Sequence, residues 1–199
     1  PVLVEARQEN DQSLFIVDKI HDLSRQGIEL NQIAVLFRAG YHSFDLEIEL
    51  TRAQMPFIKV GGFKFVESAH IKDVLAHLRV ISSPYDRISW YRILLIIEKI
   101  GPATAQKIYE AVVGEASGCN GFQRIQSKTG SAGLKRLQAL FAVIDSHAMP
   151  LEKMGEAIIE YYLPILKERY DDHPKRAKDL EQLLAIMERY SNLEQFLTD

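Results

Sequence analysis

The stretch "IAVLFRAG", residues 33–40, decides the fold prediction for the first part of the chain. It places five apolar residues in a row and then reaches Arg38. A short, continuous run of β-branched and aromatic residues is typical of a strand buried on both faces, as in a parallel sheet. Ligands collect outside the carboxyl ends of such strands. We therefore expect Arg38 to lie where an anion can be held; a solvated surface charge or an ion-pair partner is the alternative.

Strand and helix signals alternate on both sides of this stretch. Residues 12–26 carry apolar side chains at near-helical spacing, and Gly27 follows as a stop. The segment "VLVEA" at the start predicts a short strand, and "PFIKV" at 56–60 predicts another, which Gly61 and Gly62 end. The order β-α-β-α-β predicts a parallel sheet with right-handed crossovers over residues 1–65.

The segment "FDLEIEL", residues 44–50, fits two structures. Its strict alternation of apolar and acidic residues is the signature of a strand. Phe44 and Ile48 also pair at i, i+4, as do Leu46 and Leu50 in the same segment, and a serine precedes them as an N-cap. Between two strands of a β-α-β unit a helix is expected, with its acidic residues facing solvent.

From residue 66 to residue 199 the sequence predicts only helices, which makes the overall fold class α/β plus all-α. Apolar residues recur on one face from Ile71 to Ile81 and stop at Ser82-Ser83-Pro84. Arg124 and Lys128 lie in a Gly/Ser-rich connection, residues 114–133, with two further basic residues just after it. Solvation explains this mildly basic neighbourhood. Further amphipathic segments cover residues 87–97, 103–113, 133–146, 151–169 and 175–190.

Composition excludes several classes of protein. No apolar run approaches the about 20 residues of a membrane span, and the first residues do not form a signal peptide. The single cysteine, Cys119, excludes an internal disulfide framework and favours the cytoplasm. Six scattered histidines predict no metal site.

Net charge argues against binding nucleic acid over a broad surface. Residues 1–65 carry 7 Lys/Arg against 9 Asp/Glu, and residues 66–199 carry 17 against 18. Nucleic-acid contacts, if present, must therefore be local. Because the chain begins on Pro and ends on "NLEQFLTD", we expect it to be a piece of a longer protein.

Four stretches in this order resemble the C-terminal part of superfamily-one DNA helicases of the UvrD/PcrA/Rep type. They are "IAVLFRAGYHSFDLEIEL", "MPFIKVGGFKFVES", "HIKDVLAHLRVISSPYDRISWYRIL" and "EKIGPATAQKIYEAV". The first looks like that family's motif IV, an apolar strand ending on aromatic-Arg. The second and third are similar to its run from a glycine pair into a helix with Ile-Lys-Asp and Leu-Arg. The closing "NLEQFL" resembles the helix that leads out of the inserted subdomain.

The resemblance implies a specific function. Residues 1–65 would be part of the second RecA-like motor domain, and residues 66–199 the inserted helical subdomain, called 2B. The parent protein would hydrolyse ATP with Mg²⁺ in a cleft shared with a missing first RecA-like domain, and move 3′ to 5′ along DNA. Phe37 would lie near the adenine, and Arg38 would reach the γ-phosphate as an arginine finger.

A second candidate site lies in "EKIGPATAQKI". Gly101 followed by Pro102 predicts a helix start whose free backbone N–H groups can bind phosphate. The family has a similar Gly-Ile-Gly element in a helix-hairpin-helix that touches duplex DNA. The resemblance makes Lys99, Gly101, Thr104 and Lys107 candidate contacts to a single-strand/duplex junction. Lys99 stands where the family has its first glycine, and a plain helix start between packed helices is the alternative.

The sequence lacks the phosphate-binding motif that ATP hydrolysis needs. No G-x-x-x-x-G-K-[ST] motif is present, so we expect no ATP hydrolysis, and no bound ATP or Mg²⁺, by this chain alone. Two rival readings stay open: a free-standing, non-catalytic module that binds DNA or protein, and a fragment of a larger helicase–nuclease. The pathway of the parent, whether DNA repair, plasmid replication or recombination, stays open as well.

Overall fold

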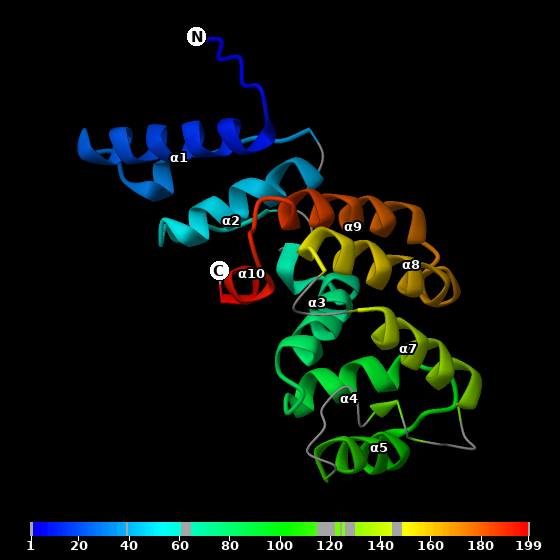
Figure 1. The fold of residues 1–199 in the computed structure, drawn as a ribbon. Coiled ribbons are helices and arrows are strands. Elements are labelled where there is room, and N and C mark those ends of the chain that lie inside the picture. The colour runs from blue at the N-terminus through cyan, green and yellow to red at the C-terminus, as the bar shows by residue number, and fades with distance from the viewer. Residues whose placement is uncertain are drawn as a thin grey trace. The chain divides into compact units, whose positions relative to one another are not determined.

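The computed structural model describes residues 2–38, 40–60, 65–114, 122–123, 125, 130–144 and 149–198. The chain divides into two compact units, Pro1–Ser68 and Ala69–Asp199. Each unit is built from helices (Figure 1) and is described by itself. The glycine pair Gly61-Gly62 and the basic residues Arg124 and Lys128, all singled out in the sequence, lie outside the described residues.

The described residues of the first unit form two α-helices and three short 3₁₀ turns. Helix α1 ends just before Gly27, whose φ of 89° is the left-handed conformation that terminates helices. Helix α2 confirms the prediction of a helix over residues 44–50 and packs against α1. The elements in order are α1 (Glu9–Arg25), η1 (Leu30–Gln32), η2 (Gly40–Ser43), α2 (Phe44–Arg52) and η3 (Phe65–Glu67).

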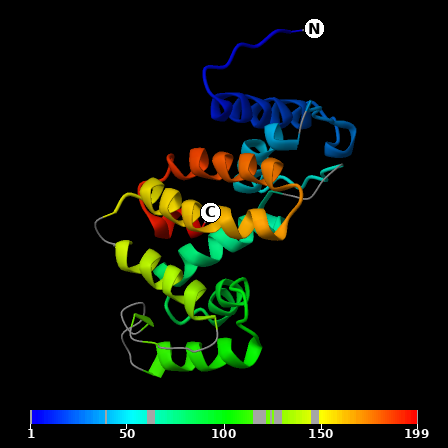
Figure 2. The same cartoon turned by 90° about the vertical axis from the view of Figure 1, so that its right-hand side faces the viewer.

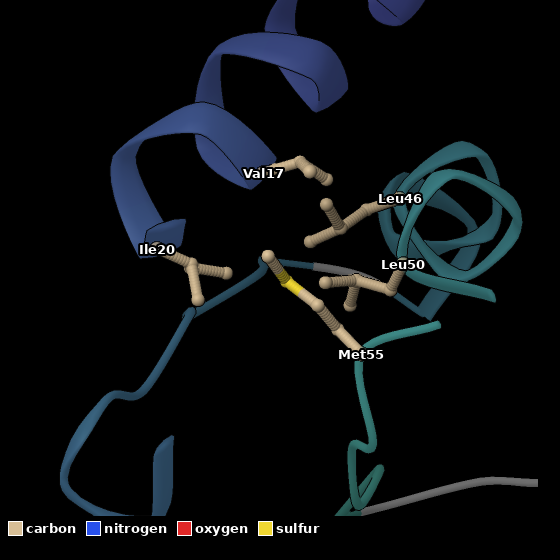
Figure 3. Close-up of a cluster of buried hydrophobic side chains, with 5 residues drawn as sticks. All are labelled: Val17, Ile20, Leu46, Leu50 and Met55. Atoms are coloured by element: carbon tan, nitrogen blue, oxygen red, sulfur yellow. The ribbon is translucent and has the colours of Figure 1, made fainter. Parts of the chain in front are cut away.

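A small apolar cluster holds α1 and α2 together (Figure 3). Its buried members are Val17 and Ile20 from α1, Leu46 and Leu50 from α2, and Met55 just after α2. Partly buried side chains of the adjoining segments pack against it: Ile16, Ile33, Phe37, Ala53 and Phe57. Ile33 and Phe37 therefore hold one side of the segment 33–37 against the cluster.

The predicted parallel sheet is wrong. Among the described residues there is no β-strand. Ile33 has extended backbone angles, but no described residue of the segment 33–37 is paired with another strand, and Leu36 is 92% exposed. Ile58 and Val60 of the segment "PFIKV" are equally exposed. An apolar run indicates that a segment tends to be buried, but it does not show which strand the segment would pair with. An extended segment forms a strand only when backbone hydrogen bonds join it to a neighbouring strand.

The acidic side chains of α2 do not face solvent, which corrects a second expectation. Asp45, Glu47 and Glu49 are 7%, 8% and 6% exposed. Glu49 accepts hydrogen bonds from Asn10 at 2.9 Å and from Arg52 at 3.0 Å. Buried carboxylates need such partners, because burial without them carries a desolvation penalty. Glu47 has three partners, the Ser43 hydroxyl, the Lys59 ammonium and the Phe65 backbone N–H.

The second unit is assembled around α3 (Figures 1 and 2). Helix α3 contacts α4, α8, α9 and α10, while α4 packs on α5, and α7 on α8. The apolar stripe predicted from Ile71 to Ile81 lies on α3, and the helix ends at Ser82 as predicted. The elements are α3 (Ala69–Ser82), α4 (Arg87–Leu95), α5 (Pro102–Gly114), α7 (Ser131–Val143), α8 (Leu151–Arg169), α9 (His173–Met187) and α10 (Leu193–Thr198).

Buried Asp73 of α3 joins three helices of this unit. One carboxylate oxygen accepts a hydrogen bond from Arg92 Nε of α4 at 2.7 Å, and the other accepts from the Tyr162 hydroxyl of α8 at 2.6 Å. Burial raises the pKa of the Tyr162 hydroxyl, and the Asp73 charge raises it further. Both carboxylate oxygens are satisfied, so the charge is tolerated inside the unit.

One turn along α3, His77 is completely buried. Its Nδ1 donates a hydrogen bond to the Asp73 backbone carbonyl at 2.8 Å, so the ring is held as one neutral tautomer. The Tyr161 ring lies edge-on at 5.5 Å between centroids. Burial lowers the pKa of His77 to about 4, although the hydrogen bond and the charge of Asp73 act in the opposite direction.

This pKa predicts that acid destabilises the chain. In the unfolded chain His77 takes up its proton near pH 6.5, whereas in the folded chain it does so only near pH 4. The contribution is fully present above pH 6.5 and is lost as the pH falls toward 4, at a total cost of roughly 3 kcal/mol. Urea unfolding of the wild type and His77→Phe at pH 7 and pH 5 measures it. The wild type should lose more stability than the variant; equal losses would contradict the buried, neutral histidine.

Candidate functional site

The structure separates the predicted site residues into two groups, one in each unit. Phe37 and Arg38 belong to the first unit, and Lys99, Gly101, Thr104 and Lys107 belong to the second. Phe37 is half-buried against the apolar cluster, and Arg38 immediately after it is exposed. A rigid aromatic anchor therefore precedes a guanidinium that is accessible to a ligand.

The backbone on the other side of Arg38 is also held. The 3₁₀ turn η2 begins at Gly40, two residues after Arg38, and leads directly into α2. The Ser43 hydroxyl lies 2.7 Å from the Gly40 carbonyl oxygen and 2.8 Å from Glu47 Oε1. Phe37 before Arg38 and Gly40 after it each have contacts of their own, and Ala39 lies outside the described residues.

In the second unit, α4 and α5 are joined by a tight turn around Lys99. The Ile100 N–H donates to the Ile97 carbonyl at 3.2 Å, which closes a four-residue turn. Lys99 occupies its third position with φ of 66°. This is a left-handed conformation that type II turns require and that glycine adopts without steric cost. A tight turn therefore forms here although Lys99 stands where the family has a glycine, and the lysine adopts a glycine-like conformation.

Helix α5 begins at Pro102, as predicted, directly after this turn. The Gly101 carbonyl accepts a hydrogen bond from the Ala105 N–H at 2.9 Å. Gly101 and Lys107 are exposed and Thr104 is half-buried. The first N–H groups of a helix have no acceptor within it, so the start of α5 offers donors to an anion.

The start of helix α7 packs against the turn around Lys99. A Cβ at Gly130 would lie 2.5 Å from Ile100 Cγ1 and 3.2 Å from the Glu98 carbonyl oxygen, and one at Gly133 would collide with Ile97. Only glycine therefore allows the start of α7 to lie this close to the turn. This packing against α7 holds the turn in its tight form, although a lysine occupies the left-handed position.

Lys99 keeps its charge accessible. Its ammonium lies 3.4 Å from a carboxylate oxygen of Glu98, and both side chains are more than 70% exposed. Exposed pairs of this kind are worth between nothing and about 1 kcal/mol, so an anionic ligand can replace the partner.

Neither group forms a metal centre. In the part of the chain that the structure describes, no set of three or more His, Cys, Asp or Glu side chains is placed to hold an ion. No helix within the same ranges is long and apolar enough to cross a membrane.

Comparison with known proteins decides the family. The model of the UvrD-like helicase C-terminal domain matches residues 1–196. The chain belongs to this helicase C-terminal domain family. The resemblance to UvrD- and PcrA-type helicases inferred from the motifs is thereby confirmed.

The relatives of this chain are much longer than the chain itself. A probable DNA helicase II homolog of Mycoplasma capricolum is 32% identical over 203 residues, which cover 100% of this chain and 27% of that protein. The ATP-dependent DNA helicase PcrA of Staphylococcus epidermidis is 36% identical over 105 residues, 52% of this chain and 14% of the relative. The PcrA of Staphylococcus aureus is 34% identical over the same length. The chain therefore spans about a quarter of the first relative.

Sequence reasoning missed one residue next to the Arg38 segment, Glu47. Its partners Lys59 and Phe65 lie 12 and 18 residues further along the chain. A helical pattern reports neighbours three or four residues away and cannot show partners at such distances. The only signal was Ser43, placed four residues before Glu47 at hydrogen-bonding distance on a helix.

The Lys99 turn generates a stability prediction. Lys99→Gly should stabilise the chain by up to about 1 kcal/mol, because glycine adopts φ of 66° without the steric cost that lysine bears. Gly101→Ala is the matched control: its backbone is not left-handed and its added methyl group would meet open space. Urea unfolding should show a gain for Lys99→Gly and little change for Gly101→Ala. A loss of stability in Lys99→Gly would contradict the strained turn.

Proposed function

We propose that this chain is part of an ATP-dependent 3′–5′ DNA helicase. In this proposal the unit Pro1–Ser68 supplies Arg38 to the ATP cleft, and the helical unit contacts duplex DNA near Gly101. The observation that carries it is the family match over residues 1–196, together with relatives named as DNA helicases. A protein of this kind works in the cytoplasm, where the DNA of its bacterial relatives lies.

Arg38 is suited to act as an arginine finger. Phosphoryl transfer develops charge on the transferred group and its leaving oxygen, and a rigidly held guanidinium stabilises that charge with two parallel hydrogen bonds. Arg38 is exposed, and the preceding Phe37 packs against the apolar cluster. Phe37 keeps part of its ring outside the apolar cluster, which leaves a surface for the adenine.

The remaining parts of the ATP site belong to the rest of the protein in this proposal. The sequence has no phosphate-binding loop with its lysine. The first RecA-like domain would supply that loop and the ligands of Mg²⁺, and no residue of this chain is assigned to the ion. Arg38 would act across the cleft on a nucleotide held by that domain.

Arg38→Ala in the full-length protein tests this role. DNA-stimulated ATP hydrolysis should fall by about 10³–10⁵-fold, the range found for arginine fingers. DNA affinity without nucleotide should barely change, because Arg38 faces the nucleotide in this proposal. Arg38→Lys should fail nearly as severely, since an ammonium cannot form the planar pair of hydrogen bonds. Equal losses of hydrolysis and DNA affinity would show that Arg38 has a structural role instead.

The turn around Lys99 and the start of α5 form the proposed duplex contact. It combines free backbone N–H groups, the Thr104 side chain and the ammonium groups of Lys99 and Lys107. These groups can bind phosphates and read no base edges, so binding should lack sequence preference. Because few phosphates are neutralised, the dependence on salt should be shallow.

Reversing both charges tests the duplex contact. Lys99→Glu combined with Lys107→Glu should weaken binding to a single-strand/duplex junction and reduce unwinding by the full-length protein. Hydrolysis stimulated by single-stranded DNA should fall less, because the motor track lies elsewhere. Lys167→Glu with Lys175→Glu is the control, since it makes the same charge change at exposed positions on α8 and α9. If the Lys99→Glu/Lys107→Glu variant unwinds DNA as well as the control variant does, the turn around Lys99 has only a packing role.

A further inference from the structure

Helices α4 and α5 share an exposed face that is rich in tyrosine and arginine. Tyr85, two residues before α4, is 60% exposed, and Ile88 in the first turn of α4 is 83% exposed. Arg87 is exposed, and Tyr91 and Tyr109 are half-buried. We call these five residues the aromatic face. Tyrosine and arginine are enriched at the centres of binding surfaces, because flat, amphipathic side chains bury a large area at a low cost in entropy.

Contacts within the aromatic face join the two helices. The Arg87 guanidinium carbon lies 5.1 Å from the centroid of the Tyr91 ring, and the Tyr109 ring lies edge-on to Tyr91 at 6.2 Å between centroids. The Tyr109 hydroxyl donates a hydrogen bond to the Tyr85 backbone carbonyl at 3.0 Å. The backbone that carries Tyr85 is therefore held by α5 before any partner binds, and such preorganisation lowers the entropic cost of binding.

Gln106 of α5 holds the Tyr91 ring in its place beside Arg87. The Tyr91 hydroxyl donates to Gln106 Oε1 at 2.8 Å, and Gln106 Nε2 donates to Glu110 Oε1 at 2.7 Å. The Arg87 guanidinium stays exposed while it lies against this ring. Nucleobases stack on aromatic rings and on guanidinium planes alike. Tyr85 and Arg87 thus offer two stacking surfaces to a ligand.

The aromatic face continues from the proposed duplex contact along α5. Lys107 of that contact follows Gln106 directly in the sequence, and both residues are exposed. Glu110 lies three residues after Lys107 and is its neighbour on the helix surface. A carboxylate repels phosphates and an ammonium attracts them. A DNA strand that crosses this face therefore has its phosphates toward Lys107 and its bases toward the rings.

Flat side chains favour unpaired over paired DNA. In a duplex each base is stacked between its neighbours, and a protein meets only phosphates and the edges of the bases. Unpaired bases expose their faces, and every base can stack on an aromatic ring or on arginine. A junction therefore calls for phosphate donors where the duplex ends and flat side chains beside them. The hairpin of α4 and α5 carries both.

We propose that the aromatic face binds the first unpaired bases of DNA at a single-strand/duplex junction, with Tyr85 and Arg87 as the stacking groups. Contact through the faces of the bases gives no sequence preference. This inference rests on the proposed function, in which the turn around Lys99 and the start of α5 contact the adjoining duplex. It adds a single-strand contact to the helical unit.

Tyr85→Ala in the full-length protein is the first test. Its affinity is measured without nucleotide for a blunt duplex and for a fork with the same paired sequence and two short single-stranded tails. Affinity for the fork should fall by about 5–100-fold, the range that corresponds to the loss of one stacked base. Affinity for the blunt duplex should not change. An unchanged affinity for the fork, or equal losses for the two DNAs, would overturn the inference.

Two further substitutions of Tyr85 separate stacking from general apolar contact. Tyr85→Phe keeps the flat ring and should bind the fork as the wild type does. Tyr85→Leu keeps apolar bulk without a ring and should lose nearly as much affinity as Tyr85→Ala. The side chain is exposed, and its backbone bond to Tyr109 survives each change, so all three variants should fold. A Tyr85→Leu variant that binds like the wild type would overturn the stacking role.

Ile88→Ala is the matched control within the aromatic face. Ile88 is more exposed than Tyr85 and has no flat surface, so its removal should change the affinity for the fork very little. A loss as large as that of Tyr85→Ala would overturn the inference, because it would show an apolar docking surface of the kind that a protein partner uses.

A photochemical crosslink locates the bases directly. 5-Iodouracil placed at the first unpaired position, in each strand in turn, should crosslink to Tyr85 from one of the two strands. Crosslinks that miss the aromatic face from both strands would overturn the inference. Failure of the proposed duplex contact looks different: Lys99→Glu with Lys107→Glu would then leave the affinity for the blunt duplex unchanged. The two failures are therefore distinguishable.

Discussion

The ion pair between Glu47 and Lys59 joins the start of α2 to a segment that follows that helix, at an Nζ–Oε1 distance of 2.6 Å. The same carboxylate binds the Phe65 N–H and the Ser43 hydroxyl, so three separate pieces of the first unit meet at one charge. The apolar cluster beside it has only five buried members among the described residues. Removing one partner of a buried pair costs about 3–5 kcal/mol, which is large for a unit with so small a core.

The helical unit uses the same device at Asp73. Its two carboxylate oxygens bind Arg92 of α4 and Tyr162 of α8, which fixes both helices on α3. A second polar contact, from buried His70 to partly buried Asp179 at 3.0 Å, joins α3 to α9. The arginine Arg176 donates to the other nitrogen of His70 at 3.1 Å. Directional polar contacts between helices fix their register, which an apolar interface alone leaves adjustable.

The helices could be predicted from the sequence because their evidence is local. Apolar spacing, Gly27 after α1, the Ser-Ser-Pro stop after α3 and Pro102 at the start of α5 each act within one or two turns. The sheet failed because "IAVLF" shows a tendency to be buried and does not name a partner strand. Its Phe37 packs on helices instead, while Leu36 stays exposed. The acidic face of α2 failed because the partners of Glu47 lie beyond the reach of any helical pattern.

The candidate site divides in the same way. Motif resemblance selected Phe37, Arg38 and the turn around Lys99 from the sequence alone, whereas the supports of each had to come from the structure. Gly130 and Gly133 let α7 pack closely against the turn, and the Glu47 carboxylate binds Lys59 and the Phe65 backbone N–H. Both are contacts between segments far apart in the chain, which single-sequence patterns do not encode.

The position of the Arg38 guanidinium in a nucleotide-loaded complex tests the central claim most directly. The measurement is a structure of the full-length protein bound to a non-hydrolysable ATP analogue and a single-strand/duplex junction. We expect a guanidinium nitrogen of Arg38 to lie about 3 Å from an oxygen of the terminal phosphate group, with Gly40 still held by Ser43. An Arg38 side chain directed away from the nucleotide in that complex would contradict the claim.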